Sequence, residues 1–169
     1  IREKFEKAWN SELPKRRGIT KITAMDQMLR GRVKGVYIMG ENTVVSDPNT
    51  NHAQAALEAA DFIVVQDIFM TDTAKLADVV LPAASFAESD GTFANSERRV
   101  QRVRPAIKPV GESRTDVDIL LDLMNRFGID QNLHSASDVW DEMRGLSPLF
   151  GGISYERLDN EGGIQWPCP

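Results

Sequence analysis

The sequence predicts an α/β fold, in which a three-layer, Rossmann-like domain is built on a parallel sheet. Three short apolar runs carry this prediction, at residues 35–40 (GVYIMG), 62–67 (FIVVQD) and 78–82 (DVVLP). Short β-branched runs of this kind are typical of buried strands. Helical segments separate the runs, and strands that alternate with helices along a chain favour a parallel sheet with helices on its faces.

The segments around the three runs have helical spacing and polar residues suited to capping. Helices are expected within residues 1–18, 22–32, 51–60, 71–77, 114–128 and 135–145. Three of these helices have two candidate caps each, which are Asp47 or Asn49, Thr71 or Asp72, and Ser135 or Ser137. Residues 91–105 are predicted to form extended chain or a hairpin, with turn chemistry at Asp90-Gly91.

The length and charge of the chain limit the classes of function. The chain has 169 residues and a net charge of −5, which gives no reason to expect nucleic acid or an acidic membrane surface as a partner. No apolar run approaches the roughly 20 residues of a membrane span, and no signal peptide is visible. The sequence does not fix the compartment, although a cytoplasmic location is favoured.

Residues 1–145 are expected to form one α/β domain. The remaining residues, 146–169, are rich in glycine, proline and aromatic side chains. This composition predicts a tail that packs on a larger structure.

The chain is poor in residues that hold metals. Cys168 is the single cysteine, and His52 and His134 are the two histidines. A lone cysteine cannot build a cluster or a Cys-rich zinc site, and the histidines lack metal-ligand spacing. We therefore expect no metal ligand and no catalytic residue in this chain.

Polar groups follow each expected strand, where open α/β sheets bind ligands. Gly40 allows either a tight turn or the close approach of a ligand to the backbone. Asn42 and Ser46 offer hydrogen-bonding groups, as do Gln66 and Asp67 after the second strand. Asp67 is as well suited to a helix cap or a surface position as to contact with a ligand. Neither GxGxxG nor a P-loop motif is present, so these loops do not by themselves specify a nucleotide.

Two further features allow two interpretations each. Asp116 falls in the first turn of an expected helix, where an acid stabilises the helix dipole. A carboxylate there can also accept two N–H bonds from the edge of a guanine. The basic cluster at residues 98–108 is either a solvated face or a match for a phosphate- or carboxylate-rich neighbour, and Arg98, Arg102 and Arg104 would share one face of a strand.

Several strings, taken together, resemble the molybdopterin oxidoreductases that carry a bis-molybdopterin guanine dinucleotide. These strings are YIMGENTVVSDPN (37–49), the segment from FIVVQD to ERRVQ (62–101), and RTD (114–116). The ending GGIQWPCP (162–169) is most similar to the catalytic (alpha) subunit of formate dehydrogenases. The resemblance extends from about Trp9 to the end of the chain.

The resemblance implies that this chain is the second guanosine-binding domain of the formate dehydrogenase/DMSO reductase fold. It implies that the loop after the first strand, the turn after the second strand and one acidic residue contact the cofactor. The implied cofactor-binding residues are Gly40, Glu41, Asn42, Ser46, Gln66, Asp67, Ile68 and Asp116. Of these, Asp116 matches the acid that recognises guanine.

The chain departs from the family pattern at two positions. Thr43 stands where the family usually has proline, so we expect a less fixed backbone there. Ala83 stands where some relatives have serine, so we expect no side-chain contact with the cofactor. The family's Glu-Arg-Arg-x-Gln string is intact at 97–101 and is expected to face the pterin side or a neighbouring domain.

The resemblance also implies a parent subunit that oxidises formate to carbon dioxide. The parent would hold molybdenum or tungsten and an iron–sulfur cluster, which this chain cannot bind, and would work with its remaining domains and electron-transfer subunits. The isolated chain is expected to be inactive. Two alternatives remain, the same domain of a nitrate reductase or related oxidoreductase, and a non-catalytic scaffold domain similar to those of complex I.

Overall fold

The computed structural model describes residues 1–129 and 132–169, which fold as two compact units. Unit 2 consists of Arg16–Ala84 with Val110–Ser113. Unit 1 consists of Ile1–Lys15, Ser85–Pro109 and Arg114–Pro169. Residues 146–169 therefore pack within unit 1, and a contact of this tail with the rest of a parent subunit stays a prediction.

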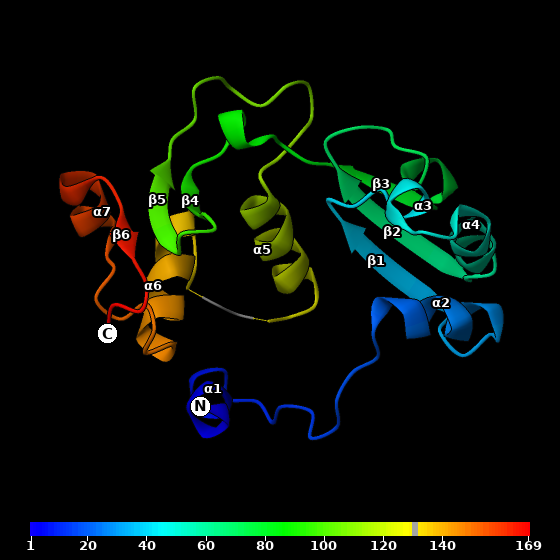
Figure 1. Cartoon of the computed structure of the whole chain (residues 1–169), viewed down its shortest axis with the longest axis horizontal. Helices are drawn as coiled ribbons and strands as arrows, with labels where there is room; N and C mark the ends of the chain where they lie inside the picture. The colour runs from blue at the N-terminus through cyan, green and yellow to red at the C-terminus, as the bar shows by residue number, and fades with distance from the viewer. Residues whose placement is uncertain (130–131) are drawn as a thin grey trace. The chain divides into compact units, whose positions relative to one another are not determined.

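Unit 2 contains the predicted parallel sheet (Figure 1). Its strands lie in the order β1-β2-β3, and all neighbours are parallel. Their bounds are Gly35–Met39 (β1), Phe62–Asp67 (β2) and Val79–Pro82 (β3). The helices of this unit are α2 (Lys21–Leu29), α3 (Thr43–Ser46), α4 (Thr50–Glu58) and the 3₁₀ turn η1 (Ala74–Leu76). The predicted α/β class and all three predicted strands are thus confirmed.

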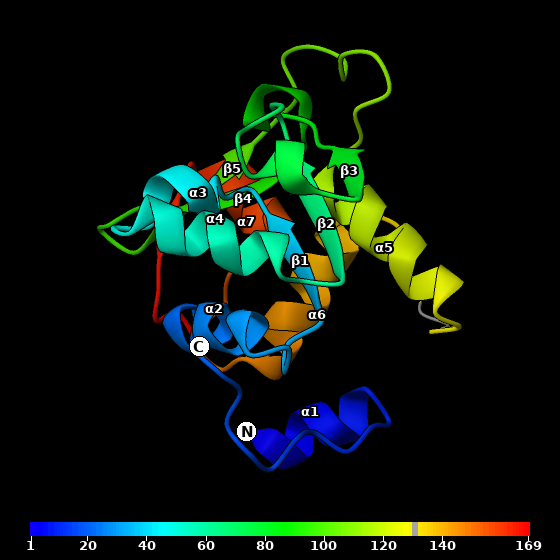
Figure 2. The ribbon, with the colours of Figure 1, turned by 90° about the vertical axis from the view of Figure 1, so that its right-hand side faces the viewer.

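One face of the sheet is covered by helices, because alternate residues of each strand point the same way. Ile38 and Val65 pack there against Met28 of α2 and Leu57 of α4, and Leu57 and Val65 are fully buried. Figure 2 shows α4 lying across the strands. The opposite face carries Tyr37, Met39, Phe62 and Val79, which are 39–49% exposed. A second helical layer would pack on this apolar face in a three-layer fold.

Unit 1 is built on an antiparallel sheet with the strand order β4-β5-β6. Its strands are β4 (Gly91–Ala94), β5 (Arg99–Val103) and β6 (Ile164–Gln165). Its helices are α1 (Arg2–Ala8), the 3₁₀ turn η2 (Phe86–Glu88), α5 (Asp116–Arg126), α6 (Ala136–Leu146) and α7 (Tyr155–Glu161). Its core contains Val100 of β5, Leu158 of α7, Trp140 of α6 and Ile153, which precedes α7. The indole Nε1 of Trp140 donates a hydrogen bond to the Ile153 carbonyl at 2.7 Å.

The 91–105 segment is a hairpin, but the predicted turn position was wrong. Gly91 opens β4, and the turn lies four residues later, at residues 95–98. The Asn95 side chain accepts hydrogen bonds from the backbone N–H groups of Glu97 and Arg99, both at 3.0 Å, and Arg98 adopts a φ of 63°. An Asn side chain that accepts hydrogen bonds from the backbone N–H groups following it stabilises a turn. The turn of the hairpin therefore forms at residues 95–98 rather than at Asp90-Gly91.

Among the residues that the structure describes, no helix is long and apolar enough to cross a membrane. In the same part of the chain, no three His, Cys, Asp or Glu side chains gather in a way that could hold a metal ion.

Candidate functional site

The loop after β1 begins with a turn that requires glycine. Gly40 has a φ of +63°, a backbone conformation that side chains disfavour, and its N–H donates to the Gln66 carbonyl at 2.8 Å. A Cβ added at Gly40 would meet nothing within 4 Å. Within this chain, the glycine is therefore needed for the turn rather than to make space.

Asn42 fixes the middle of this loop to the segment after β2. Its side-chain Oδ1 accepts hydrogen bonds from the backbone N–H of Thr73 at 3.2 Å and from the Thr73 hydroxyl at 2.9 Å. The Thr73 Oγ1 in turn accepts from the N–H of Val44 at 2.9 Å. Thr43 is 2% exposed and opens α3. The loop is therefore anchored on both sides of Thr43, and a backbone less fixed than one with proline at this position stays a prediction.

Glu41 and Ser46 face one another across the same loop. The Ser46 hydroxyl donates to Glu41 Oε1 at 2.9 Å, and the ammonium group of Lys21, from α2, forms an ion pair with the same oxygen. Lys21 Nζ also lies 3.4 Å from Ser46 Oγ. These hydrogen bonds hold the pKa of the Glu41 carboxyl below its usual value, the bond from Lys21 having the largest effect and that from Ser46 the next. Lys21 carried no signal in the sequence, because nothing in the spacing brings a residue of the preceding helix to this loop.

The predicted site residues at the end of β2 and directly after it differ in their exposure to solvent. Gln66 is fully buried, and its side chain accepts a hydrogen bond from the Tyr37 hydroxyl. Asp67 stabilises the turn by accepting from the N–H of Phe69 at 3.2 Å. Ile68 is 49% exposed, beside the exposed side chains of Phe69 and Met70. Gln66 therefore presents no side chain at the surface of the turn, whereas Ile68 does.

Seven of the eight predicted site residues thus lie in unit 2, at the carboxyl end of β2 or in the segments that follow β1 and β2. Asp116 belongs to unit 1, where it is the first residue of α5. Thr115 is the N-cap, and its side chain accepts a hydrogen bond from the Asp118 N–H at 3.2 Å. Asp116 is therefore not the cap; it is an acid in the first turn, where its charge interacts favourably with the helix dipole. Asp116 itself is exposed.

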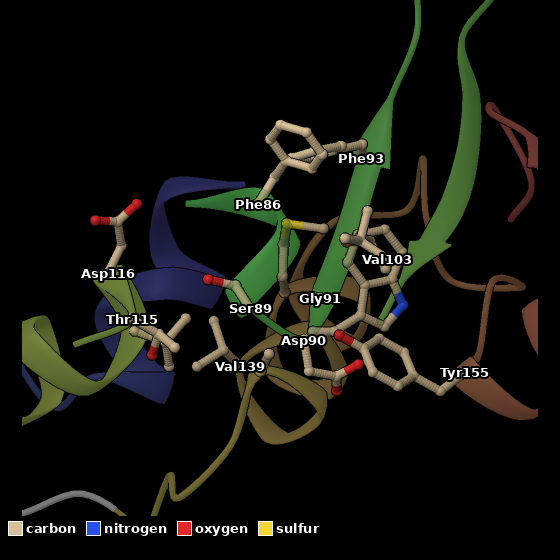
Figure 3. A pocket seen from close by; sticks show the side chains of 15 residues that line it. Phe86, Ser89, Asp90, Gly91, Phe93, Val103, Thr115, Asp116, Val139 and Tyr155 are labelled. Atoms are coloured by element: carbon tan, nitrogen blue, oxygen red, sulfur yellow. The ribbon is translucent and has the colours of Figure 1, made fainter. Parts of the chain in front are cut away.

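A pocket of about 370 Å³ lies in unit 1, and Asp116 is the predicted site residue that lines it. The apolar part of the lining includes Phe86, Phe93, Val139 and Tyr155 (Figure 3). Figure 3 shows Asp116 at one side, with its carboxylate directed away from Tyr155. The pocket has an aromatic character, and the sequence did not predict it.

The centre of the basic cluster is not a solvated face, and its partners are carboxylates of this chain. Arg102 is only 11% exposed, and it pairs with Asp90 at 3.0 Å and Asp159 at 3.1 Å. Its guanidinium lies 3.8 Å from the centre of the Tyr155 ring. Arg102 is therefore neither on a solvated face nor available to an outside phosphate. Arg98 lies in the hairpin turn, stacked 5.7 Å from the Trp166 ring, and so does not share a strand face with Arg102.

The parallel sheet of unit 2 places the chain in the class of open α/β proteins, a class in which ligands generally bind at the carboxyl ends of the strands. The chain belongs to the molybdopterin oxidoreductase family, because the family model "Molybdopterin oxidoreductase" matches residues 6–126.

Similar proteins support this assignment. The F420-dependent formate dehydrogenase subunit alpha of Methanocaldococcus jannaschii is 47% identical over 166 residues, which cover 97% of this chain and 24% of that protein. The probable oxidoreductase YjgC of Bacillus subtilis is 41% identical over 167 residues, 99% of this chain and 17% of that protein. The chain therefore spans between about a sixth and a quarter of the length of these relatives.

A solved structure shares the fold. Acetylene hydratase from Pelobacter acetylenicus superposes with a TM-score of 0.71 at 21% identity, over 88% of this chain and 21% of that one. At this identity the similarity concerns the fold alone. It agrees with the expected fold class, and the relatives named formate dehydrogenase agree with the expected resemblance.

Proposed function

We propose that this chain binds one guanosine end of a bis-molybdopterin guanine dinucleotide in the catalytic subunit of a formate dehydrogenase. The observation that carries the proposal is the anchored loop 40–46. It presents Glu41 and Ser46 at the carboxyl end of β1, and hydrogen bonds between Asn42 and Thr73 hold it in place. A loop that is already ordered loses little conformational entropy on binding.

The side chains on this loop fit a nucleoside better than a metal or an apolar ligand. Glu41 offers a carboxylate and Ser46 a hydroxyl, which suit the hydroxyl groups of a sugar. Asp116, in the first turn of α5, offers a carboxylate that can accept two N–H bonds from a guanine edge. We assign guanine recognition to Asp116 and sugar or backbone contacts to the loops after β1 and β2.

The proposed substrate of the parent subunit is formate, since several similar proteins are named formate dehydrogenases. When bound, the cofactor supplies the two-electron redox chemistry of molybdenum or tungsten, which an iron–sulfur cluster elsewhere in the parent would relay. This chain contributes binding and orientation, as proteins do for other cofactors. We further propose a cytoplasmic parent, in which residues 146–169 contact its other domains, and which has electron-transfer partner subunits.

A second candidate is the same role in an oxidoreductase with another substrate. It is favoured by the relative from Bacillus subtilis, whose name states an oxidoreductase without a substrate. One scaffold can host several reactions, and the residues that would distinguish them are not assigned to this domain. Formate-dependent reduction of an oxidised dye and nitrate-dependent oxidation of a reduced dye by the full-length parent distinguish the two, because only one of these reactions should support turnover.

Amide NMR spectra of the isotope-labelled chain, titrated with GMP and GDP, test the binding proposal. We expect shifts at residues 40–46 and 67–68 and in the first turn of α5, with smaller shifts for AMP, whose base lacks the guanine donor edge. We expect the isolated chain to bind GMP and GDP with an affinity in the millimolar range, because the other contacts with the cofactor are made by other domains of the parent. Spectra unchanged by every nucleotide would instead favour a scaffold domain that binds no cofactor.

A further inference from the structure

The carboxylate of Glu41 is held through one oxygen only. Oε1 accepts from the Ser46 hydroxyl at 2.9 Å and pairs with the ammonium group of Lys21. Among the described residues, no hydrogen bond reaches Oε2. The Glu41 side chain is 45% exposed, so the second oxygen is accessible at the carboxyl end of β1. Two fixed bonds on one oxygen thus orient the other.

The same contacts fix the charge of Glu41. The hydrogen bonds from Lys21 and Ser46 lower the pKa of this carboxyl, and burial opposes them with a smaller effect than either bond. At neutral pH the group is therefore a carboxylate, which accepts hydrogen bonds and donates none. Its charge is balanced by Lys21, so the pair would neither attract nor repel an anion strongly.

The neighbouring side chains leave Glu41 as the acceptor of this loop. The Oδ1 of Asn42 is occupied by Thr73, and the side chain of Gln66 is fully buried. The Ser46 hydroxyl hydrogen is used on Glu41. Of the residues of the loop 40–46, Glu41 therefore presents an ionised acceptor, Oε2, that two hydrogen bonds on its other oxygen orient.

We propose that Glu41 recognises the vicinal hydroxyls of the ribose, and that Lys21 is a positioning residue that orients it. This inference rests on the proposed binding of guanosine and assigns a ligand group to one residue of that site. A ribose carries two neighbouring O–H donors, and a carboxylate oxygen has two lone pairs to accept them. Phosphate is a poorer match, because its ionised oxygens accept hydrogen bonds, as the carboxylate does, and offer it no O–H donor.

The positioning role of Lys21 can be measured without any ligand. Carboxyl carbon resonances followed against pH give the pKa of Glu41 in the wild type, Lys21→Met, Lys21→Arg and Lys34→Met. The pKa should rise towards its ordinary value in Lys21→Met and stay low in Lys21→Arg. Lys34→Met is the matched control, because Lys34 pairs with Asp61 at 3.0 Å at the other end of the same strands. A Glu41 pKa that is the same in Lys21→Met and the wild type overturns the role of Lys21.

Recognition of the ribose is tested by comparing GMP with 2′,3′-dideoxyguanosine monophosphate. The wild type should bind GMP about tenfold more tightly, the value of one hydrogen bond to a charged group. Glu41→Gln and Lys21→Met should lose most of this preference, whereas Lys21→Arg and Lys34→Met should keep it.

The outcomes separate this inference from the proposed function. Equal affinity of the wild type for both nucleotides overturns ribose recognition while guanosine binding stands. A wild-type preference that Glu41→Gln keeps places the hydroxyl contact elsewhere and also overturns the inference. Lack of binding of either nucleotide refutes the proposed function, and the ribose contact with it. A loss of GMP affinity in Lys21→Met that is equal for both nucleotides identifies Lys21 as a phosphate ligand instead.

Discussion

Asn42 and Thr73 are joined by two hydrogen bonds, although 31 residues separate them. Asn42 Oδ1 accepts from the Thr73 N–H at 3.2 Å and from its hydroxyl at 2.9 Å. Thr73 is fully buried, and its Oγ1 accepts from the buried Val44 N–H at 2.9 Å. The turn after β2 thereby holds the loop after β1, so the two loops that contain most of the candidate site are coupled.

We expect Thr73→Val to loosen this coupling. The substitution keeps the shape of the side chain but leaves the Val44 N–H and the Asn42 Oδ1 without the hydroxyl, at a cost of roughly 1–3 kcal/mol. Amide hydrogen exchange of β1 and β2 measures the effect directly. Thr73→Ser, which keeps the hydroxyl, is the control and should lose less protection. Equal protection in Thr73→Val and the wild type would show that the hydroxyl is not needed.

Hydrophobic pattern and local turn chemistry were sufficient to predict the sheet. The runs at 35–40, 62–67 and 78–82 became β1, β2 and β3 because apolar residues there must be buried. Helix caps could also be predicted largely from nearby residues. Asn49 and Ser135 were each one of two candidate caps, and the side chain of each accepts a hydrogen bond from the backbone N–H three residues later. The helix expected at 71–77 shortened to the 3₁₀ turn η1.

Contacts between distant residues could not be predicted in this way. Asn42 bonds to Thr73, Glu41 to Lys21 and Arg102 to Asp159, which lie 31, 20 and 57 residues away along the chain. No periodicity relates such positions, so neither the anchor Thr73 nor Lys21 was visible before the structure. The sequence strings identified the loop 40–46, but its internal bonding had to come from the fold.

Gly40 allows a test of its two interpretations. Gly40→Ala should destabilise unit 2 by about 1–2 kcal/mol, because the positive φ disfavours a Cβ although no atom blocks it. Gly40→Asn should cost less, since asparagine tolerates this conformation better. Denaturation followed by circular dichroism measures both, and GMP titration of Gly40→Asn adds the functional readout. Preserved binding assigns the glycine to the turn, and lost binding indicates that the ligand approaches its backbone.

Arg102 should be important for the stability of unit 1. Arg102→Met leaves Asp90 and Asp159 without their shared partner and removes the stacking on Tyr155, at a cost of roughly 1–2 kcal/mol after allowance for the exposure of both carboxylates. Urea denaturation followed by tryptophan fluorescence reports on this unit, because Trp9, Trp140 and Trp166 all belong to it. Arg104→Met, at an exposed position on the same Asp159, is the control and should change stability by less than about 0.5 kcal/mol. Similar effects of the two substitutions would contradict the central role of Arg102.

Asp122 predicts a pH dependence of unit 1. Arg114 donates to its carboxylate at 2.9 Å and Arg126 at 3.1 Å, and these bonds lower its pKa from the ordinary value of 3.8. A pKa that is lower in the folded state makes a contribution to stability that is present above 3.8 and is lost as pH falls through the folded value. Wild type should therefore be more stable than Asp122→Asn at neutral pH, and the difference should vanish in acid. A difference in stability that does not change between neutral and acidic pH would exclude this ion pair as its source.

Asp116 and Asp118 offer a matched pair for testing guanine recognition. Both are acids in the first turn of α5, so replacing either with asparagine removes a similar dipole interaction, about 0.3–1 kcal/mol. Only Asp116 is proposed to accept N–H bonds from guanine. The wild type and Asp118→Asn should therefore prefer GMP to IMP, whose base lacks the amino group, and Asp116→Asn should lose the preference. In the full-length parent, Asp116→Ala should lower the molybdenum or tungsten content while Asp118→Ala does not. If both alanine variants keep full metal content and activity, Asp116 acts on the helix alone and guanine is recognised by another residue.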